Sequence, residues 1–234
     1  MGKLFGTDGV RGRVNQHPMT AETALAIGRA TACLFRRDGH VGHIVVGKDT
    51  RLSGDIVESA LVAGICSMGA QVILAGVIPT PAISFLTANS RADAGIMISA
   101  SHNPYYDNGI KIFSGNGRKL PDDMEAAVER MVLRNEFDSH LPESHALGKA
   151  MRMDDARGRY IAFLKRTFPP GMNLEGMKLI LDCANGATYQ VGPDTFNELE
   201  ASVKTLFHEP DGRNINLECG SQHPERLAEE VVRT

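Results

Sequence analysis

Short apolar runs alternate along this chain with longer segments that carry apolar residues at helical spacing. The runs 44–46, 72–74 and 94–99 consist of aliphatic or small residues, which is typical of strands covered on both faces of a sheet. Between the first two runs, Ser53 can cap a helix whose apolar side chains recur every three or four residues. The order strand, helix, strand predicts a βαβ unit and an α/β fold.

Two further helices are predicted in the first half of the chain. Thr20 can cap a helix that runs to about Arg37, with Glu22 favourably placed in its first turn. Pro121 opens an acidic helix that runs to about Asn135. These helices can supply the layers that cover a buried sheet.

A polar loop from Ala100 to Asn108 follows the third strand. Asn108-Gly109 is a tight-turn signal, and we expect it to fold the chain back into a half-buried strand over 110–113. In such a strand Lys111 points to one face while its two isoleucine neighbours point to the other. The face that carries Lys111 can therefore return towards the polar loop.

The second half of the chain is interpreted as a second, incomplete domain. A polar stretch follows the acidic helix and predicts a connection, with domains at residues 1–150 and 151–234. The stretch contains Asp138, Ser139, Pro142, Glu143 and Ser144. Beyond it, strands are predicted only at 178–181 and 203–206, and a final helix begins at Pro224. Because a two-stranded sheet is rarely stable alone, we expect this domain to be cut short.

Composition and charge exclude several classes of function. The chain of 234 residues is 42% hydrophobic, and 25 Lys and Arg face 28 Asp and Glu for a net charge of -3. There is no basic excess for a nucleic-acid backbone or an anionic membrane, and no apolar run reaches the roughly 18 to 20 residues of a membrane span. The four cysteines are widely spaced and form no C-x-x-C pair, so we expect reduced thiols in the cytoplasm.

The strongest candidate for chemistry is Ser101, in the loop after the third strand. No G-x-S-x-G elbow surrounds it, and His102 is too close in sequence for triad geometry, so acyl transfer is disfavoured. A loop serine can instead carry a phosphoryl group, which needs cations around it. Lys111 and Arg11 are the candidates, and Arg11 lies in a glycine-rich opening segment that also contains Thr7.

Ordinary structural roles compete with this hypothesis. Serine, asparagine and proline are common in turns, and a strand lysine or a loop arginine is usually solvated. Gly42 to Lys48 imitates a phosphate-binding loop, but a strand occupies its place and Asp49 replaces the required hydroxyl residue.

Two other groups of polar residues also favour a structural interpretation. His40 and His43 have metal-like spacing, but the sequence near them offers no third ligand, so two solvated histidines are expected. The stretch from Gly47 to Arg51 is interpreted as a turn with surface charges.

Five ordered motifs together resemble the α-D-phosphohexomutase superfamily. They are F-G-T-D-G-V-R-G at 5–12, G-K-D-T-R at 47–51, S-A-S-H-N-P at 99–104, D-N-G-I-K at 107–111 and D-C-A-N-G-A at 182–187. The resemblance implies three-layer α/β/α domains with mixed sheets, four in the whole protein. It also implies interconversion of the 6- and 1-phosphates of a hexose through a bisphosphorylated sugar intermediate.

The resemblance is greatest to bacterial members that act on glucosamine phosphates for cell-wall precursors. Members acting on mannose or glucose phosphates are the alternative, and a non-catalytic phosphosugar-binding module is another. A phosphosugar is thus the expected ligand, and a homodimer is left open.

The same resemblance implies roles for individual residues. Ser101 would be the phosphoserine, with Arg11 and Lys111 beside its phosphate and Lys111 placed for proton transfer. His102 and Asn103 would shape the loop, and Asn103 and Thr7 would contribute to phosphate binding.

Mg²⁺ would bind an oxygen of the Ser101 phosphate, and a hexose 1,6-bisphosphate would serve as activator. The superfamily's D-G-D-G-D-R metal loop does not occur in this sequence. We therefore expect the 234-residue chain alone to be inactive.

Overall fold

A six-stranded mixed sheet forms the centre of the computed structural model, which describes residues 4–37, 40–137 and 141–234. The strands are β1 Val10–Arg13, β2 His43–Lys48, β3 Gln71–Val77, β4 Ala94–Ile98, β5 Asp107–Ser114 and β6 Ala150–Arg152. Their order across the sheet is β1-β5-β4-β2-β3-β6. Strands β4, β2, β3 and β6 run parallel, whereas β5 is antiparallel to both β4 and β1. The predicted α/β fold with a mixed sheet is confirmed.

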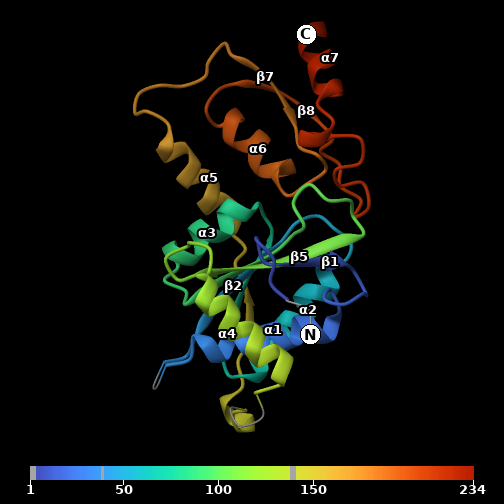
Figure 1. Ribbon diagram of the computed structural model, residues 1–234. Helices are drawn as coiled ribbons and strands as arrows, with labels where there is room; N and C mark the ends of the chain where they lie inside the picture. The colour runs from blue at the N-terminus through green and yellow to red at the C-terminus, as the bar shows by residue number, and fades with distance from the viewer. Residues whose placement is uncertain (1–3, 38–39, 138–140) are drawn as a thin grey trace.

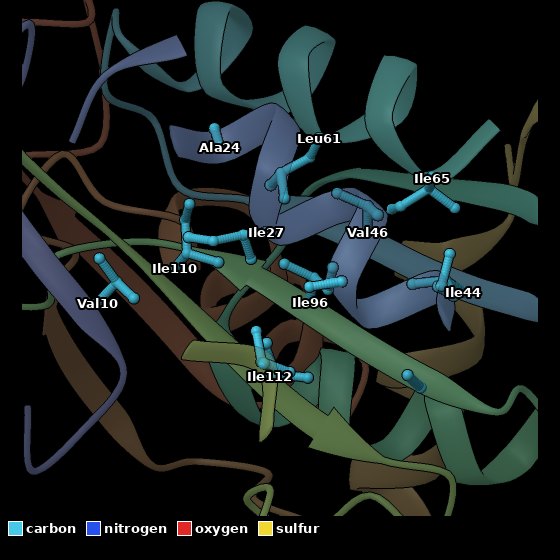
Figure 2. Packing of buried hydrophobic residues seen from close by; sticks show 14 of the residues in the cluster. Val10, Ala24, Ile27, Ile44, Val46, Leu61, Ile65, Ile96, Ile110 and Ile112 are labelled. Atoms are coloured by element: carbon cyan, nitrogen blue, oxygen red, sulfur yellow. The ribbon is translucent and has the colours of Figure 1, made fainter. Parts of the chain in front are cut away.

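Helices cover both faces of this sheet (Figure 1). Helices α1 Ala21–Leu34, α2 Gly54–Ser67 and α4 Asp122–Arg134 lie on one face, and α3 Thr80–Asn89 and α5 Ala156–Thr167 lie on the other. Figure 2 shows the first core, where Ile27 and Leu61 from the helices pack towards Ile96 of the sheet. Because strand side chains alternate, Val45 faces the second core while its neighbours face the first.

The remainder of the chain forms a smaller α/β part at one end of the sheet (Figure 1). It contains the parallel strands β7 Lys178–Asp182 and β8 Ser202–Leu206 with helices α6 Thr188–Asn197 and α7 Glu225–Arg233. Short 3-10 helices occur at Ser144–Ala146 and Gly220–Gln222. Within the described ranges, no helix is long and apolar enough to cross a bilayer.

Several predicted elements are confirmed, with small differences at their ends. Strands β2 and β3 and the helix between them form the predicted βαβ unit. The Thr20 side chain caps α1 by accepting a hydrogen bond from the Thr23 amide at 3.3 Å. Ser53 precedes α2 but does not cap it, because its Oγ contacts the Asn108 side-chain amide at 2.9 Å.

The predicted turn at Asn108-Gly109 is wrong. Both residues lie inside β5, where Gly109 pairs with Arg11, and the chain reverses earlier, between β4 and β5. Gly109 meets a different requirement, since a Cβ there would lie 2.7 Å from the Ser99 carbonyl oxygen. The glycine therefore permits close backbone packing rather than a turn.

Three elements escaped the sequence analysis. Strand β1 contains a glycine, which weakens the strand pattern in the sequence. Helix α3 begins between Pro79 and Pro81, which are typical of loops, and β6 is a short exposed strand at the edge of the sheet. In the predicted connection, residues 138–139 lie outside the described residues. Ala150 is the first residue of β6, which pairs with β3, and α5 then packs against α3.

Close packing of α1 against α2 requires glycine, and this can be tested. A Cβ at Gly64 would overlap the Leu25 carbonyl oxygen, so Gly64→Ala should lower the free energy of unfolding by about 1–3 kcal/mol in urea denaturation. Gly158→Ala in α5 is the matched control, because its Cβ would meet nothing within 4 Å. The control should be neutral or slightly stabilising, and an equal loss in both variants would contradict the packing argument.

Candidate functional site

Ser101 lies in the loop that joins β4 to β5, at the carboxyl end of β4. Its side chain is exposed, and its backbone adopts φ +58°, in the left-handed region. A non-glycine residue in this region costs about 1 kcal/mol or more and persists only when the surrounding structure holds it. The contacts of the loop explain how it is held.

The buried side chain of Arg51 binds the loop from within. Its Nε donates to Asp49 Oδ2 at 2.9 Å, and its side chain has no exposed surface. Its two terminal nitrogens donate to four backbone carbonyl oxygens, those of Ser101, Asn103, Pro104 and Asp107. A planar guanidinium with five donors suits this arrangement, which an ammonium group cannot reproduce.

Ser99 connects the same ion pair to the amide of Ser101. Its Oγ donates to Asp49 Oδ2 at 2.7 Å and accepts from the Ser101 amide at 3.0 Å. The Ser101 carbonyl accepts from Arg51 Nη2 at 2.9 Å. The amide and the carbonyl of Ser101 are thus both tied to the Asp49–Arg51 pair, while the hydroxyl side chain stays at the surface.

The smaller part of the chain also holds this loop. Asn216 Nδ2 donates to the carbonyl oxygens of Ser101 at 2.9 Å and Asn103 at 3.0 Å. Thr50, between the two charged residues, donates to the Asn185 carbonyl oxygen at 2.5 Å. Nothing in the sequence near Asn216 pointed to this role, because its contact with Ser101 spans 115 residues.

The interpretation of Gly47 to Arg51 as a turn with surface charges is wrong. Asp49 and Arg51 are only 4% and 3% exposed. Their burial depends on backbone carbonyls that a distant loop supplies, and charge patterning along the segment cannot reveal them. The one local signal was their position directly after a buried strand, where α/β folds place their sites.

Lys111 and Arg11 lie on one face of the antiparallel pair β1 and β5. Arg11 pairs with Gly109, and Lys111 is two residues further along the same face, while Ile110 points into the first core as predicted. Asp8 Oδ2 lies 2.5 Å from Lys111 Nζ and 3.6 Å from Arg11 Nη2. The structure thus brings the two predicted cations together and adds a carboxylate that the sequence analysis did not consider.

The other predicted residues have different surroundings. Asn103 is half-buried and donates to Asp107 Oδ2 at 2.9 Å, which stabilises the loop, and His102 is exposed. Thr7 is exposed and lines a cavity against α4 with acidic neighbours that include Glu125 and Glu129. Burial raises the pKa of Glu125, although Lys119 opposes this.

The residues around Ser101 offer no complete metal site. Among the described residues, the cluster of three groups that could hold an ion is His40, His43 and Asp93, which lies at the amino ends of β2 and β4, away from Ser101. The described residues around Ser101 therefore supply no cluster of three such groups that could complete a Mg²⁺ site with an oxygen of a phosphorylated Ser101. The arrangement suits a phosphoryl carrier with local cations, because loop clamping orients the hydroxyl and cations balance phosphate charge.

Comparison with known proteins identifies a family and a fold. The protein-family model described as phosphoglucomutase/phosphomannomutase, alpha/beta/alpha domain I, matches residues 2–139 of this chain. The phosphoglucosamine mutase of Syntrophus aciditrophicus is 67% identical over 233 residues, covering 100% of this chain and 52% of the relative. The chain spans about half the length of the curated relatives it matches.

Solved structures show the same fold. A phosphoglucomutase/phosphomannomutase family protein from Burkholderia thailandensis superposes with a TM-score of 0.82 at 26% identity, over 98% of this chain and 49% of that one. The N-acetylphosphoglucosamine mutase of Aspergillus fumigatus, in complex with GlcNAc-6P and magnesium, has a TM-score of 0.50 at 14% identity. It covers 97% of this chain and 45% of that one, and this likeness concerns the fold alone.

Replacing Arg51 tests whether its guanidinium holds the loop. Arg51→Lys keeps the charge but loses most of the carbonyl contacts, so the free energy of unfolding should fall by at least about 2 kcal/mol. Amide hydrogen exchange should become at least about tenfold faster over residues 99–107. Arg226→Lys is the control, since that side chain is 72% exposed. Unchanged exchange in the loop of the Arg51 variant would sink the argument.

Proposed function

Because the chain belongs to the phosphoglucomutase/phosphomannomutase family, we propose that it forms the phosphoserine half of a phosphoglucosamine mutase. The whole protein would interconvert glucosamine 6-phosphate and glucosamine 1-phosphate for cell-wall amino-sugar precursors. The observation that carries the proposal is the clamped, exposed Ser101 after the carboxyl end of β4, together with the paired cations Arg11 and Lys111 on the adjoining strands β1 and β5. Identity of 67% to a phosphoglucosamine mutase supports glucosamine over mannose or glucose as the sugar.

In the proposed reaction, Ser101 Oγ carries the phosphoryl group and exchanges it with the sugar. The bond between phosphorus and Ser101 Oγ breaks, and a bond forms between phosphorus and a sugar hydroxyl oxygen. The proton that leaves the sugar hydroxyl balances the one that Ser101 Oγ gains, and Lys111 is the group proposed to carry it. Return of the other phosphoryl group from the bisphosphorylated sugar to Ser101 restores the phosphoserine.

Fixed backbone contacts and nearby cations are what this chain contributes to that exchange. The Asp49–Arg51 pair holds Ser101 in one backbone conformation, which reduces the entropy lost on reaching the reactive geometry. Asp8 balances Lys111 and Arg11 in the described structure. A phosphate on Ser101 or on the sugar would compete with this carboxylate for the two cations. Because phosphate carries more negative charge than a carboxylate, the cations would bind the phosphate in preference.

The remaining elements of the proposal depend on the whole protein. Mg²⁺, when bound to a Ser101 phosphate oxygen, would supply neutralisation of the charge on the transferring group. The N-acetylphosphoglucosamine mutase of Aspergillus fumigatus, which shares the fold, has been solved in complex with magnesium. A hexose 1,6-bisphosphate would be the activator, the compartment would be the cytoplasm, and a homodimer remains a prediction.

All of the residue assignments, those of Ser101, Lys111 and Arg11 included, stay predictions. His102 and Asn103 are proposed to shape the loop and Thr7 to bind phosphate. Residues 1–150 would form the domain that carries the serine loop, and residues 151–234 would belong to the second domain.

Phosphorylation of the chain tests the carrier role of Ser101. After incubation of a full-length protein with glucose 1,6-bisphosphate and Mg²⁺, its intact mass should show one phosphoryl group that maps to Ser101. Ser101→Ala should abolish it, whereas Ser59→Ala on the exposed side of α2 should retain it. A phosphoryl group that survives in the Ser101 variant would refute the assignment.

Catalysis should require the longer protein. Supplied with glucosamine 6-phosphate, Mg²⁺ and a bisphosphate, the 234-residue chain should show no turnover above background, because no carboxylate cluster of its described residues surrounds Ser101. In a full-length protein, Lys111→Ala should lower kcat/KM by about 10²–10³-fold, as is typical when one charge-stabilising donor is lost. Faster turnover of mannose or glucose phosphates than of glucosamine phosphates would favour the alternative mutases.

A further inference from the structure

A second cluster of side chains that could bind a ligand lies at the amino ends of β2 and β4, whereas the serine loop follows the carboxyl end of β4. His43 is the first residue of β2, and Asp93 immediately precedes β4, its parallel neighbour. The Asp93 amide donates to the His43 carbonyl oxygen at 2.8 Å, which holds the two residues side by side. His40 lies three residues before β2, and its backbone pairs with that of Arg37. Three potential ligands thus converge from two segments of the chain.

The contacts within this cluster leave ligand atoms available. His40 Nε2 lies 3.0 Å from Asp93 Oδ2 and 3.2 Å from Oδ1, and the His43 amide donates to Asp93 Oδ2 at 2.9 Å. One potential ligand atom from each of the three side chains lies within 4.8 Å of the others. The His43 interaction uses only its backbone, so its imidazole is not needed to fix Asp93.

These separations are close to those of a bound ion. Ligand atoms about 2.1 Å from a tetrahedral ion lie roughly 3.4 Å from one another. The His40–Asp93 pair, at 3.0 Å, must open by about 0.4 Å to reach this separation, and the third ligand must approach by up to about 1.4 Å. The His40 side chain is 45% exposed and can rotate to close the site, whereas Asp93 is 8% exposed and fixed by its backbone contacts.

The sequence offers no third ligand near these histidines, whereas the structure places Asp93 next to them. Asp93 is 50 residues from His43 in the chain and reaches it only because β2 and β4 pair in this register. The pairing of Ile44 with Ala94 places the residues before them next to each other.

We propose that His40, His43 and Asp93 bind one divalent transition-metal ion of the Zn²⁺ type, with a water molecule in the remaining position. Two imidazoles and one carboxylate suit Zn²⁺, Co²⁺ or Ni²⁺, whereas Mg²⁺ prefers oxygen ligands alone. The site is therefore chemically distinct from the magnesium chemistry proposed at Ser101. A bound ion would tie the turn before β2 to the start of β4 and stabilise that end of the sheet.

A simpler structure competes with this proposal, namely an ion pair between a protonated His40 and Asp93. In that case the imidazole of His43 contributes nothing. Arg37 also acts electrostatically on Asp93, and its charge opposes a cation there, so we expect micromolar rather than nanomolar affinity. The contribution of the His43 ring therefore decides between the two arrangements.

Isothermal titration of the tag-free chain with Zn²⁺ tests the site. We expect one equivalent bound with micromolar affinity, weakened at least tenfold in His40→Gln and in His43→Gln. The second variant is the decisive one, because it retains the backbone contact to Asp93 and should leave the fold intact by circular dichroism. His145→Gln is the control, since that side chain is 80% exposed and outside the cluster. Excess Mg²⁺ should not displace Zn²⁺.

Two further readouts keep the result interpretable. Zn²⁺ should raise the Tm of the wild-type chain and of the control but not of His43→Gln, because only a ligand that binds the folded site stabilises it. Co²⁺ should give absorption bands of nitrogen and oxygen ligation without thiolate charge transfer. Affinity unchanged in His43→Gln, or a thiolate band from the four free cysteines, would overturn the proposal.

Discussion

The ion pair between Asp49 and Arg51 is the contact on which the serine loop depends. Two charged side chains are nearly excluded from water, and each can remain there only because the other and the surrounding hydrogen bonds compensate its lost solvation. The carbonyls that complete the shell of Arg51 belong to the loop that presents Ser101. The hydrogen bonds that the buried guanidinium of Arg51 requires therefore also hold the exposed Ser101 in its strained backbone conformation.

The same segment couples the two parts of the chain. Thr50 lies between the paired charges and donates to the Asn185 carbonyl, and the Leu52 amide donates to the Gly212 carbonyl at 2.8 Å. Asn216 then approaches the loop and shares its carbonyls with Arg51. Because these contacts share acceptors, a displacement of the smaller part would alter the hydrogen bonding of Ser101 itself. The position of Ser101, the proposed phosphoryl carrier, therefore depends on where the smaller part of the chain lies.

The two ends of the central strands β2 and β4 offer different ligand chemistry. At the carboxyl end of β4, hydroxyl and cationic groups gather, and Asp8 keeps Arg11 and Lys111 balanced. At the amino ends of β2 and β4, imidazoles meet a fixed carboxylate. The first arrangement favours phosphate and the second favours a nitrogen-preferring metal ion. Parallel pairing of β2 with β4 aligns the starts of these strands, which generates the second arrangement, whereas the cations of the first arrangement come from the antiparallel pair β1 and β5.

The sequence by itself determined the βαβ unit around β2 and β3, the cap at Thr20, the serine loop after β4 and the opposite faces of Ile110 and Lys111. Each depends on hydrophobic period or on a preference of neighbouring residues, and both are local. Only the tertiary structure decided that Arg51 is buried, that Asn216 contacts Ser101, that Gly109 is in a strand and that Asp93 joins two histidines. These depend on partners that pairing brings from 50 or more residues away, and a buried polar group is identified by its partner rather than by its sequence neighbours.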